Sequence, residues 1–176
     1  MAFDPTDIAT LEVGGSDFKV LDDGSYEFEV DSAEWGQSRA GVDMLTVTFV
    51  GTDGESSGVN FTDRVVMTYE RKKDKKTVLH WNIPMYAHVA GGEKLFPADV
   101  KARVKVMSDL DKWKETVAKG LIGKKVTLDL VKVPGRAYLD PKTGEEKMGY
   151  ESNNVDRNGY HWASTGNTKS ASSVVI

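Results

Sequence analysis

The sequence contains no cysteine, which excludes disulfide bonds, thiolate metal ligands and cysteine nucleophiles. It also lacks any apolar run near the roughly 20 residues that span a bilayer, so we expect no membrane association. The acidic first residues lack the apolar core of a signal peptide, and we do not expect secretion by that route. Together these absences favour a cytoplasmic protein.

The signatures of common enzyme classes are missing as well. The three histidines, His80, His88 and His161, include no pair at the helical spacing of metal ligands. The run Gly120–Lys125 is too short for a phosphate-binding loop and has lysine where that loop needs serine or threonine. No nucleophile elbow of the Gly-x-Ser-x-Gly type occurs. We therefore expect no enzymatic activity, no cofactor and no metal.

Charge is distributed unevenly along the chain. Residues 1–60 contain thirteen acidic and two basic residues, a formal charge of −11, whereas residues 61–150 carry +7. The formal net charge of the whole chain is −4, so a net-acidic protein can still present a basic surface to a polyanion. The alternative is an ordinary soluble surface on which charges cluster by chance.

The clearest strand pattern covers roughly residues 24–35. Tyr26, Phe28 and Val30 alternate with glutamates, so they share one face of a strand. The phase of the alternation changes at Asp31–Ser32, as it does where a strand contains one extra residue. This pattern predicts a long, bent strand with a bulge.

Four further segments have strand character. Apolar side chains alternate with polar ones in each segment, and turns rich in glycine or proline separate them. The expected strands cover roughly 43–50, 59–70, 124–133 and 145–155. A turn is predicted at Asp140–Gly144, where proline presets φ and glycine supplies a positive φ.

Two helices are predicted between the third and fourth strands. The first has Asn82 as its cap and Pro84 in its first turn, and it ends at Gly91–Gly92. The second is capped by Ser108 and ends at Gly120. The inward stripe of the second helix consists of Leu110, Trp113 and Val117.

The expected fold is mainly β with a helical insertion, an α+β order of three strands, helices and two strands. Five strands with a helix between the third and fourth is the arrangement of the OB fold, a partly open Greek-key barrel. Another five-stranded barrel or an α+β sandwich would give the same order. We expect an N-terminal arm at 1–20, the barrel domain at 21–156 and a flexible C-terminal tail at 157–176.

Two groups of segments share a pattern of turns and apolar positions. The first group is Leu21-Asp-Asp-Gly24-x-Tyr26, Ala33-Glu34, Ser38-x-x-Gly41 and Met44-Leu45-x-Val47-x-Phe49. The second group is Leu121–Val126, a hairpin with Gly144, and Asn153-Asn154-Val155. These groups resemble the first and second halves of one family, the phage-encoded single-stranded DNA-binding proteins of the OB-fold type. The resemblance implies a role in phage DNA replication or recombination, in the host cytoplasm. One departure is the C-terminal end, since Lys169–Ile176 is neutral to basic where many such proteins have an acidic tip.

Binding of single strands needs cations along a groove and flat side chains on which bases stack. Three clusters of the sequence pair basic with aromatic residues, and in an OB fold the first and last hairpin loops frame the binding cleft. The expected nucleic-acid-binding residues are Trp35, Arg39, Tyr69, Arg71, Lys72, Lys73, Lys75, Lys76, Lys132, Arg136, Tyr138, Lys147 and Tyr150. Each has a structural alternative, and Trp35 fits the core as well as it fits a stacking platform.

The sequence thus favours binding of single-stranded DNA, with RNA as the alternative ligand, without sequence specificity and without catalysis. Contacts with replication or recombination proteins, and assembly into a homo-oligomer, are further expectations. The alternative function is a protein-interaction or virion-structural β-barrel module. In that alternative, the tail Val174–Ile176 docks on another chain.

Overall fold

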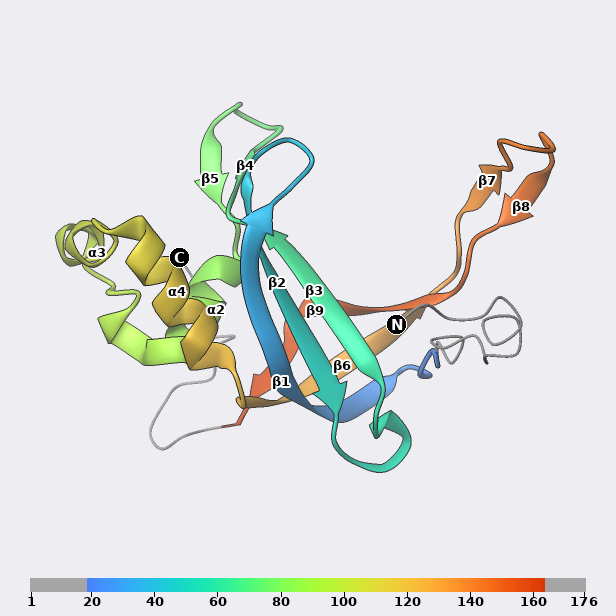
Figure 1. Ribbon diagram of the computed structural model, residues 1–176, viewed down its shortest axis with the longest axis horizontal. Coiled ribbons are helices and arrows are strands. Elements are labelled where there is room, and N and C mark those ends of the chain that lie inside the picture. Colours follow the sequence, from blue (N-terminus) through green and yellow to red (C-terminus); the bar gives the residue numbers. More distant parts are fainter. Residues whose placement is uncertain (1–18, 164–176) are drawn as a thin grey trace, which may run out of the picture.

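A computed structural model of the chain describes residues 19–163 (Figure 1). The fold is mixed α+β, with one five-stranded antiparallel sheet, two small hairpins and three α-helices in this part of the chain. The helices lie between the third and fourth strands of the large sheet, as the sequence predicted. None of the helices in residues 19–163 is long and apolar enough to cross a membrane.

The large sheet has the order β3-β2-β1-β6-β9. Its strands are β1 (Gly24–Gln37), β2 (Asp43–Gly51), β3 (Asn60–Val66), β6 (Lys125–Val133) and β9 (Ser152–Trp162). The first three strands follow one another, and β6 returns through the long helical connection to lie beside β1. This order, fourth strand beside the first, is a Greek key.

Strand β1 is the centre of the sheet and is long enough to pair on both sides. Its first half pairs with β6 and its second half with β2, and Phe28 and Glu29 pair with both neighbours. The register with β2 shifts between Val30 and Ser32, which confirms the predicted bulge at Asp31. Because the bulge adds one residue, both Val30 and Ala33 face the core, where they are 1% and 8% exposed.

The two edge strands of the large sheet, β3 and β9, are not paired with each other within residues 19–163. Side chains connect them instead. The Asp63 carboxylate of β3 accepts a hydrogen bond from the Tyr160 hydroxyl of β9 at 2.9 Å, and others from Tyr86 and Asn82 of the adjoining helix. The sheet is therefore curved and open, and side chains rather than backbone pairing span the opening.

The helices are α2 (Asn82–Gly91), α3 (Val100–Val106) and α4 (Leu110–Leu121). Helix α4 packs on α2 and on β1, and its buried stripe is Trp113, Val117 and Leu121. Short 3₁₀ turns lie at Gly54–Ser56 and Gly92–Lys94. The core lies between the concave side of the sheet and helices α2 and α4. Its most buried large side chains include Phe28, Leu45, Phe49, Ile83, Tyr86, Leu121 and Leu128.

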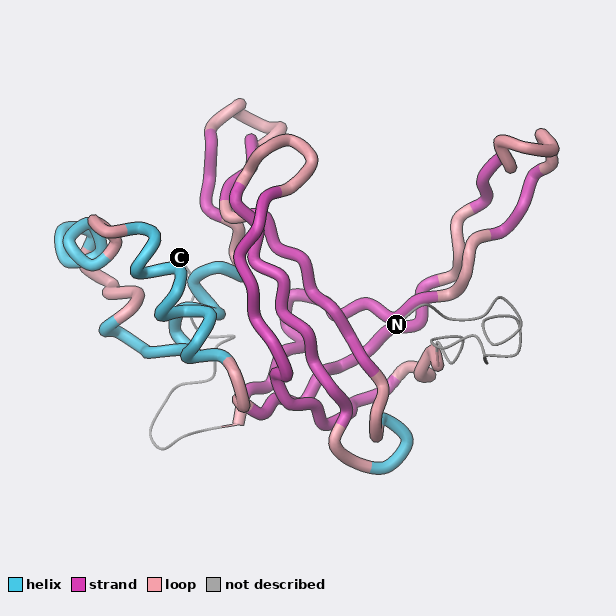
Figure 2. The backbone as a smooth tube through the Cα atoms, in the orientation of Figure 1, coloured by secondary structure: helices cyan, strands magenta, loops and turns pink. Residues whose placement is uncertain are grey.

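Two hairpins project from this body (Figure 2). The β4–β5 hairpin pairs β4 (Thr68–Glu70) with β5 (Thr77–Leu79), and the β7–β8 hairpin pairs β7 (Ala137–Leu139) with β8 (Glu146–Met148). The β7–β8 hairpin extends farthest from the sheet, on the side away from the helices (Figure 1). The turn predicted at Asp140–Gly144 is confirmed, with Gly144 at φ +69°.

Two predicted strands are wrong in extent because the chain changes partner within them. The strand expected at 59–70 divides at Met67, whose N–H bonds to the Asp43 carbonyl of β2 while its carbonyl accepts from His80. Residues beyond Met67 therefore form the β4–β5 hairpin, and β5 lies where the sequence predicted no strand. The strand expected at 145–155 likewise divides into β8 and β9.

Strand β9 also continues to Trp162, into residues where the sequence predicts a flexible tail. Its register with β6 shifts between Leu128 and Leu130, which pair with Tyr160 and Val155 respectively. The extra residues of β9 interrupt the alternation of apolar side chains, so the pattern ends early in the sequence. Tyr160 is nevertheless in the core, at 4% exposure.

The predicted helix starts need correction in detail. Asn82 does not cap α2 through its side chain, because its amide bonds to Asp63 instead. Asp109, and not Ser108, caps α4 by accepting the N–H of Lys112. Leu110 is 37% exposed because it lies in the first turn, before the buried stripe begins. The third helix, α3, was not predicted.

Candidate nucleic-acid interface

The predicted basic run Arg71–Lys76 forms the turn of the β4–β5 hairpin. The turn is closed by backbone bonds between residues 71 and 75–76, and Lys75 adopts a positive φ of 58°. Arg71 forms an ion pair with Asp74, which raises the pKa of the guanidinium and lowers the pKa of the carboxyl. Lys75 lies 3.6 Å from Glu70. Two of the five cations are therefore partly neutralised within the hairpin.

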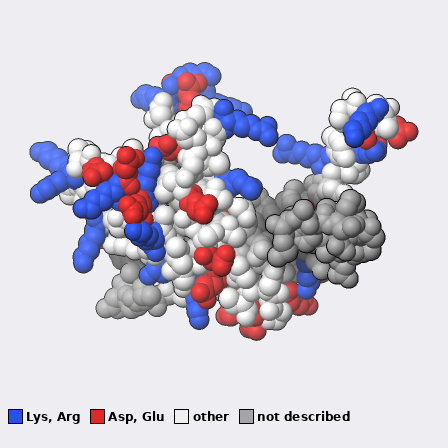
Figure 3. Space-filling view, in the orientation of Figure 1, with Lys and Arg blue, Asp and Glu red and all other residues white. Residues whose placement is uncertain are grey.

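The remaining lysines of the turn, Lys72, Lys73 and Lys76, are exposed and form no ion pair with any residue from 19 to 163. Residues 68–79 carry five basic and two acidic side chains. Figure 3 shows this hairpin as a mainly blue projection on the surface. An exposed, cationic turn of this kind attracts phosphate groups.

A row of aromatic rings begins at this hairpin and leads into the body. Tyr69 of β4, 42% exposed, contacts the ring of His80 edge-on, with centroids 5.7 Å apart. His80 stacks on Trp81 at 5.7 Å. We call these three residues the aromatic row. At its inner end Trp81 meets the buried Tyr160 ring at 6.1 Å.

The chain places the aromatic row through two local features. His80 and Trp81 lie between β5 and α2, where the His80 N–H bonds to Met67 and its ring accepts the N–H of Asn82. Partial burial lowers the pKa of His80, which favours the neutral ring at physiological pH. The Arg157 guanidinium of β9 lies 5.6 Å from the centre of the Trp81 ring. A cation therefore accompanies the aromatic row, as in sites that stack nucleic-acid bases.

His80, Trp81 and Arg157 were not among the predicted site residues. In the sequence, Trp81 lies beside a predicted helix start, and this position favours a role in the core. Arg157 lies beyond the last expected strand. A signal was nevertheless present, since two consecutive aromatic rings follow the basic turn by only a few residues. The pairing of β4 with β5 brings the rings back beside Tyr69.

Trp35 lies elsewhere, against helix α4. Its indole N–H donates to the carbonyl of Lys114 at 2.9 Å, and its ring lies 6.3 Å from that of Trp113. The Lys114 ammonium, itself paired with Asp43, is 5.6 Å from the Trp35 ring centre. These contacts favour the packing alternative for Trp35 over the stacking platform.

Arg39 lies in the exposed loop between β1 and β2. The loop is fixed by the Gly41 N–H bonding to the Ser38 carbonyl and by Gly41 at a positive φ of 77°. In Figure 1 this loop and the β4–β5 hairpin emerge at the same end of the sheet. The loop that carries Arg39 thus lies at the same end of the sheet as the basic turn.

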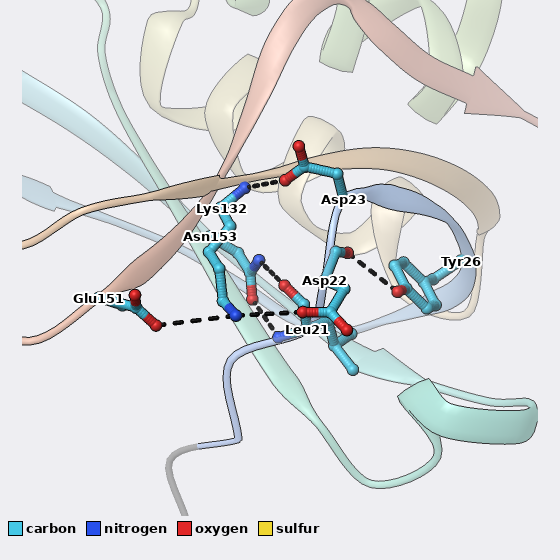
Figure 4. A network of polar contacts seen from close by, with 7 residues as sticks. All are labelled: Leu21, Asp22, Asp23, Tyr26, Lys132, Glu151 and Asn153. Carbon is cyan, nitrogen blue, oxygen red and sulfur yellow. Dashed lines mark hydrogen bonds and ion pairs between the residues drawn. The ribbon is translucent and has the colours of Figure 1, made fainter.

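Lys132 lies in a network of acidic side chains (Figure 4). Its ammonium group pairs with Asp22 at 3.0 Å and lies 3.7 Å from Glu151. The backbone N–H of Lys132 donates to the Asp23 carboxylate. The carboxylates raise the pKa of Lys132. Beside it, the Asn153 amide bonds to both backbone groups of Leu21. This network joins the start of β1 to β6 and β9, and it leaves Lys132 little free charge for phosphate.

The remaining predicted site residues lie on the β7–β8 hairpin or at its base. Arg136, Tyr138 and Tyr150 are exposed, and Lys147 pairs with Asp140. This hairpin and the β4–β5 hairpin project from the body at separate places in Figure 3. The structure therefore brings Tyr69 and Arg71–Lys76 together with the aromatic row, but it holds the β7–β8 residues apart.

The described residues contain no group of three or more histidine, aspartate or glutamate side chains arranged to hold a metal ion. The sequence matches no protein-family model, and a search of curated proteins finds no significant similarity. The geometry of the β4–β5 hairpin and the aromatic row is thus the basis for assigning a function.

Proposed function

We propose that the protein binds single-stranded nucleic acid, DNA in the first place, through the β4–β5 hairpin and the aromatic row, without catalysis. The observation that carries the proposal is the continuity of Tyr69, His80 and Trp81 with an exposed basic turn. Single-strand binding combines these two elements, because cations contact the phosphates while bases stack on aromatic rings.

The proposal includes an OB-fold type of architecture. The Greek-key order of the large sheet, with β9 added beside β6, agrees with a partly open five-stranded barrel. The hydrogen bond that Asp63 of β3 accepts from Tyr160 of β9 spans the opening between these strands, and Tyr86 of α2 donates to the same carboxylate. In such barrels the loops at one end border the nucleic-acid cleft, which is consistent with Arg39 lying at the same end as the basic turn.

Each group has a defined role in the proposed complex. Lys72, Lys73 and Lys76 neutralise phosphates, while Tyr69 and Trp81 supply stacking surfaces. Stacking contributes about 1–3 kcal/mol per base and tolerates every base, because each has a π-face. The complex should therefore prefer single strands to duplexes and show little sequence preference. A phage-encoded protein with these properties would serve DNA replication or recombination.

The test is a titration with poly-dT at two salt concentrations, followed by the native tryptophan fluorescence. We expect quenching, because Trp81 lies in the proposed site, and an affinity that falls steeply as salt rises. Poly-rU in parallel compares RNA with DNA, and duplex DNA serves as the control. Tight binding whose affinity does not depend on salt would refute the proposal, and so would tight binding that prefers duplex DNA to single strands.

The second candidate is a protein-interaction or virion-structural module. The observation in its favour is the β7–β8 hairpin, on which Leu139 and Met148 are 70% and 68% exposed. Large apolar side chains on a projecting element mark sites of protein contact. Absence of any binding to poly-dT, with both hairpins folded, would favour this candidate.

A further inference from the structure

The β7–β8 hairpin has features that set it apart from the basic turn. We define the arm as residues 134–150, which contain three basic and three acidic side chains, so it carries no excess charge to attract phosphates. Beside these charges it exposes four large apolar or aromatic side chains. They are Tyr138 at 51%, Leu139 at 70%, Met148 at 68% and Tyr150 at 98% exposure. This composition fits a protein partner better than a nucleic acid.

The arm is a preformed element. At its base a Cβ atom on Gly135 would lie 1.8 Å from the carbonyl oxygen of Gly149, so only glycine allows the two strands to meet there. At its tip the Asp140 carboxylate accepts the N–H of Lys142 and pairs with Lys147. An isolated two-stranded hairpin is marginally stable in water, and these contacts fix its shape before a partner binds.

Both outer edges of the arm are unpaired within residues 19–163, because β7 and β8 have only each other as neighbours. The Gly149 N–H bonds to the Arg136 carbonyl and the Asp140 N–H to the Glu145 carbonyl. Inward and outward backbone groups alternate along an antiparallel strand. The N–H and C=O groups of Ala137 and Leu139 therefore point away from β8, toward the open edge of β7.

The edge of β7 is complementary to itself. When two copies of β7 pair antiparallel about a twofold axis at Tyr138, Ala137 lies opposite Leu139 and Arg136 lies opposite Asp140. The outward groups of Ala137 and Leu139 then bond to their counterparts, and the small and large side chains alternate across the axis. Opposite charges and aromatic residues that face each other across strands are favourable pairs.

The edge of β8 lacks this property. The equivalent pairing about its middle residue places Lys147 opposite its own copy, and like charges directly opposite destabilise a pair of strands. Charged residues on an edge strand are a common protection against pairing. Glu145, Glu146 and Lys147 protect β8 in this way, whereas the sequence Ala137-Tyr138-Leu139 leaves β7 open.

We propose that the arm is a self-association surface, on which the β7 edges of two copies of this chain pair in antiparallel register. An interface that is the same on both copies closes as a dimer. Three-residue strands bury little surface, so the dimer should be weak and dissociate on dilution. This inference is separate from the proposed function, because it uses neither the basic turn nor the aromatic row.

The test is sedimentation velocity of the full chain without nucleic acid, over a wide range of concentrations up to the solubility limit. We expect a monomer–dimer equilibrium. Ala137→Pro removes an outward N–H of β7 without removing a bond of the hairpin. It should weaken dimerisation about tenfold or more, since each dimer loses two hydrogen bonds. The matched control is Glu146→Pro, which removes an outward N–H of β8 and should leave the dimer unchanged.

A second variant guards against misfolding of the proline variants. Leu139→Lys retains a favourable cross-strand partner, Glu146, in its own hairpin, and it should also weaken the dimer. A monomer at every concentration would overturn the proposal, as would equal effects of Ala137→Pro and Glu146→Pro. If Ala137→Pro lowers the affinity for poly-dT and leaves the monomer–dimer equilibrium unchanged, the arm binds nucleic acid, and the self-association proposal is overturned as well.

Discussion

The Tyr160 hydroxyl donates a hydrogen bond of 2.9 Å to the Asp63 carboxylate, although the two residues lie on edge strands that do not pair. The same carboxylate oxygen accepts from Tyr86 at 2.6 Å and from Asn82 at 3.1 Å. Asp63 thus joins β3, β9 and α2 at the opening of the sheet. The Tyr160 ring contacts the Trp81 ring, and Asn82 follows Trp81 in the sequence. The hydrogen bonds to Asp63 therefore also support the aromatic row.

Asp63→Ala should lower the free energy of unfolding by about 2–4 kcal/mol. The change leaves three buried donors without an acceptor, and hydrogen bonds to a charged group stabilise more than neutral ones. The measurement is chemical denaturation followed by tryptophan fluorescence. Asp53→Ala is the matched control, because Asp53 is exposed and makes no side-chain capping bond. Equal stability of the two variants would show that the Asp63 connection does not hold the sheet together.

Stability should also fall at alkaline pH. Burial and the neighbouring Asp63 raise the pKa of Tyr86 and Tyr160 well above the ordinary value of about 10. In the unfolded chain both phenols ionise near pH 10, whereas in the folded chain they stay protonated. The free energy of unfolding therefore falls as pH rises above 10, by up to about 2.7 kcal/mol per pH unit for the two groups.

The measurement for this prediction is chemical denaturation at a series of pH values from about 8 to 11, a range that includes the ordinary pKa of a tyrosine hydroxyl. Tyr160→Phe should be less stable at neutral pH but should lose less stability on the alkaline side. Tyr150→Phe is the matched control, because Tyr150 is 98% exposed. An identical alkaline slope in wild type and Tyr160→Phe would contradict the assignment.

The central part of the sheet could be predicted from the sequence because its signals are local. Alternation fixed the faces of Phe28 and Val30, and a change of phase revealed the bulge at Asp31. The capping and glycine signals located α2 and α4 to within a few residues. These elements depend on neighbouring residues, which is the information that a single sequence contains.

The two hairpins and the end of β9 depend instead on distant contacts. The division at Met67 results from its bonds to Asp43 and His80, and the extent of β9 results from pairing with β6 around a bulge. The same limit applies to the site. The basic turn was visible as a charge run, but the contact of Arg157 with Trp81 requires the folded chain.

Replacing Lys72, Lys73 and Lys76 by glutamine should weaken binding to poly-dT and flatten its salt dependence. Each lost phosphate contact lowers the slope of log K against log salt by roughly 0.7, so three contacts lower it by about 2. The control is the same replacement at Lys101, Lys105 and Lys112, which removes equal charge from helices α3 and α4. An equal loss of slope in both variants would indicate a general charge effect and not a site on the β4–β5 hairpin.

Trp81→Ala and Trp35→Ala should separate stacking from packing. If bases stack on Trp81, its removal weakens binding by about 1–3 kcal/mol with little change in the salt slope. Trp35 packs on Trp113 and bonds to Lys114, so its removal should lower the melting temperature while the remaining folded protein binds normally.

Anisotropy of labelled oligo-dT measures affinity without relying on tryptophan, and thermal melts in the same buffer measure stability. Because Trp81 also touches Tyr160, Trp81→Phe keeps an aromatic ring there and should recover most of the affinity. Normal binding by a folded Trp81→Ala variant would remove the aromatic row from the site.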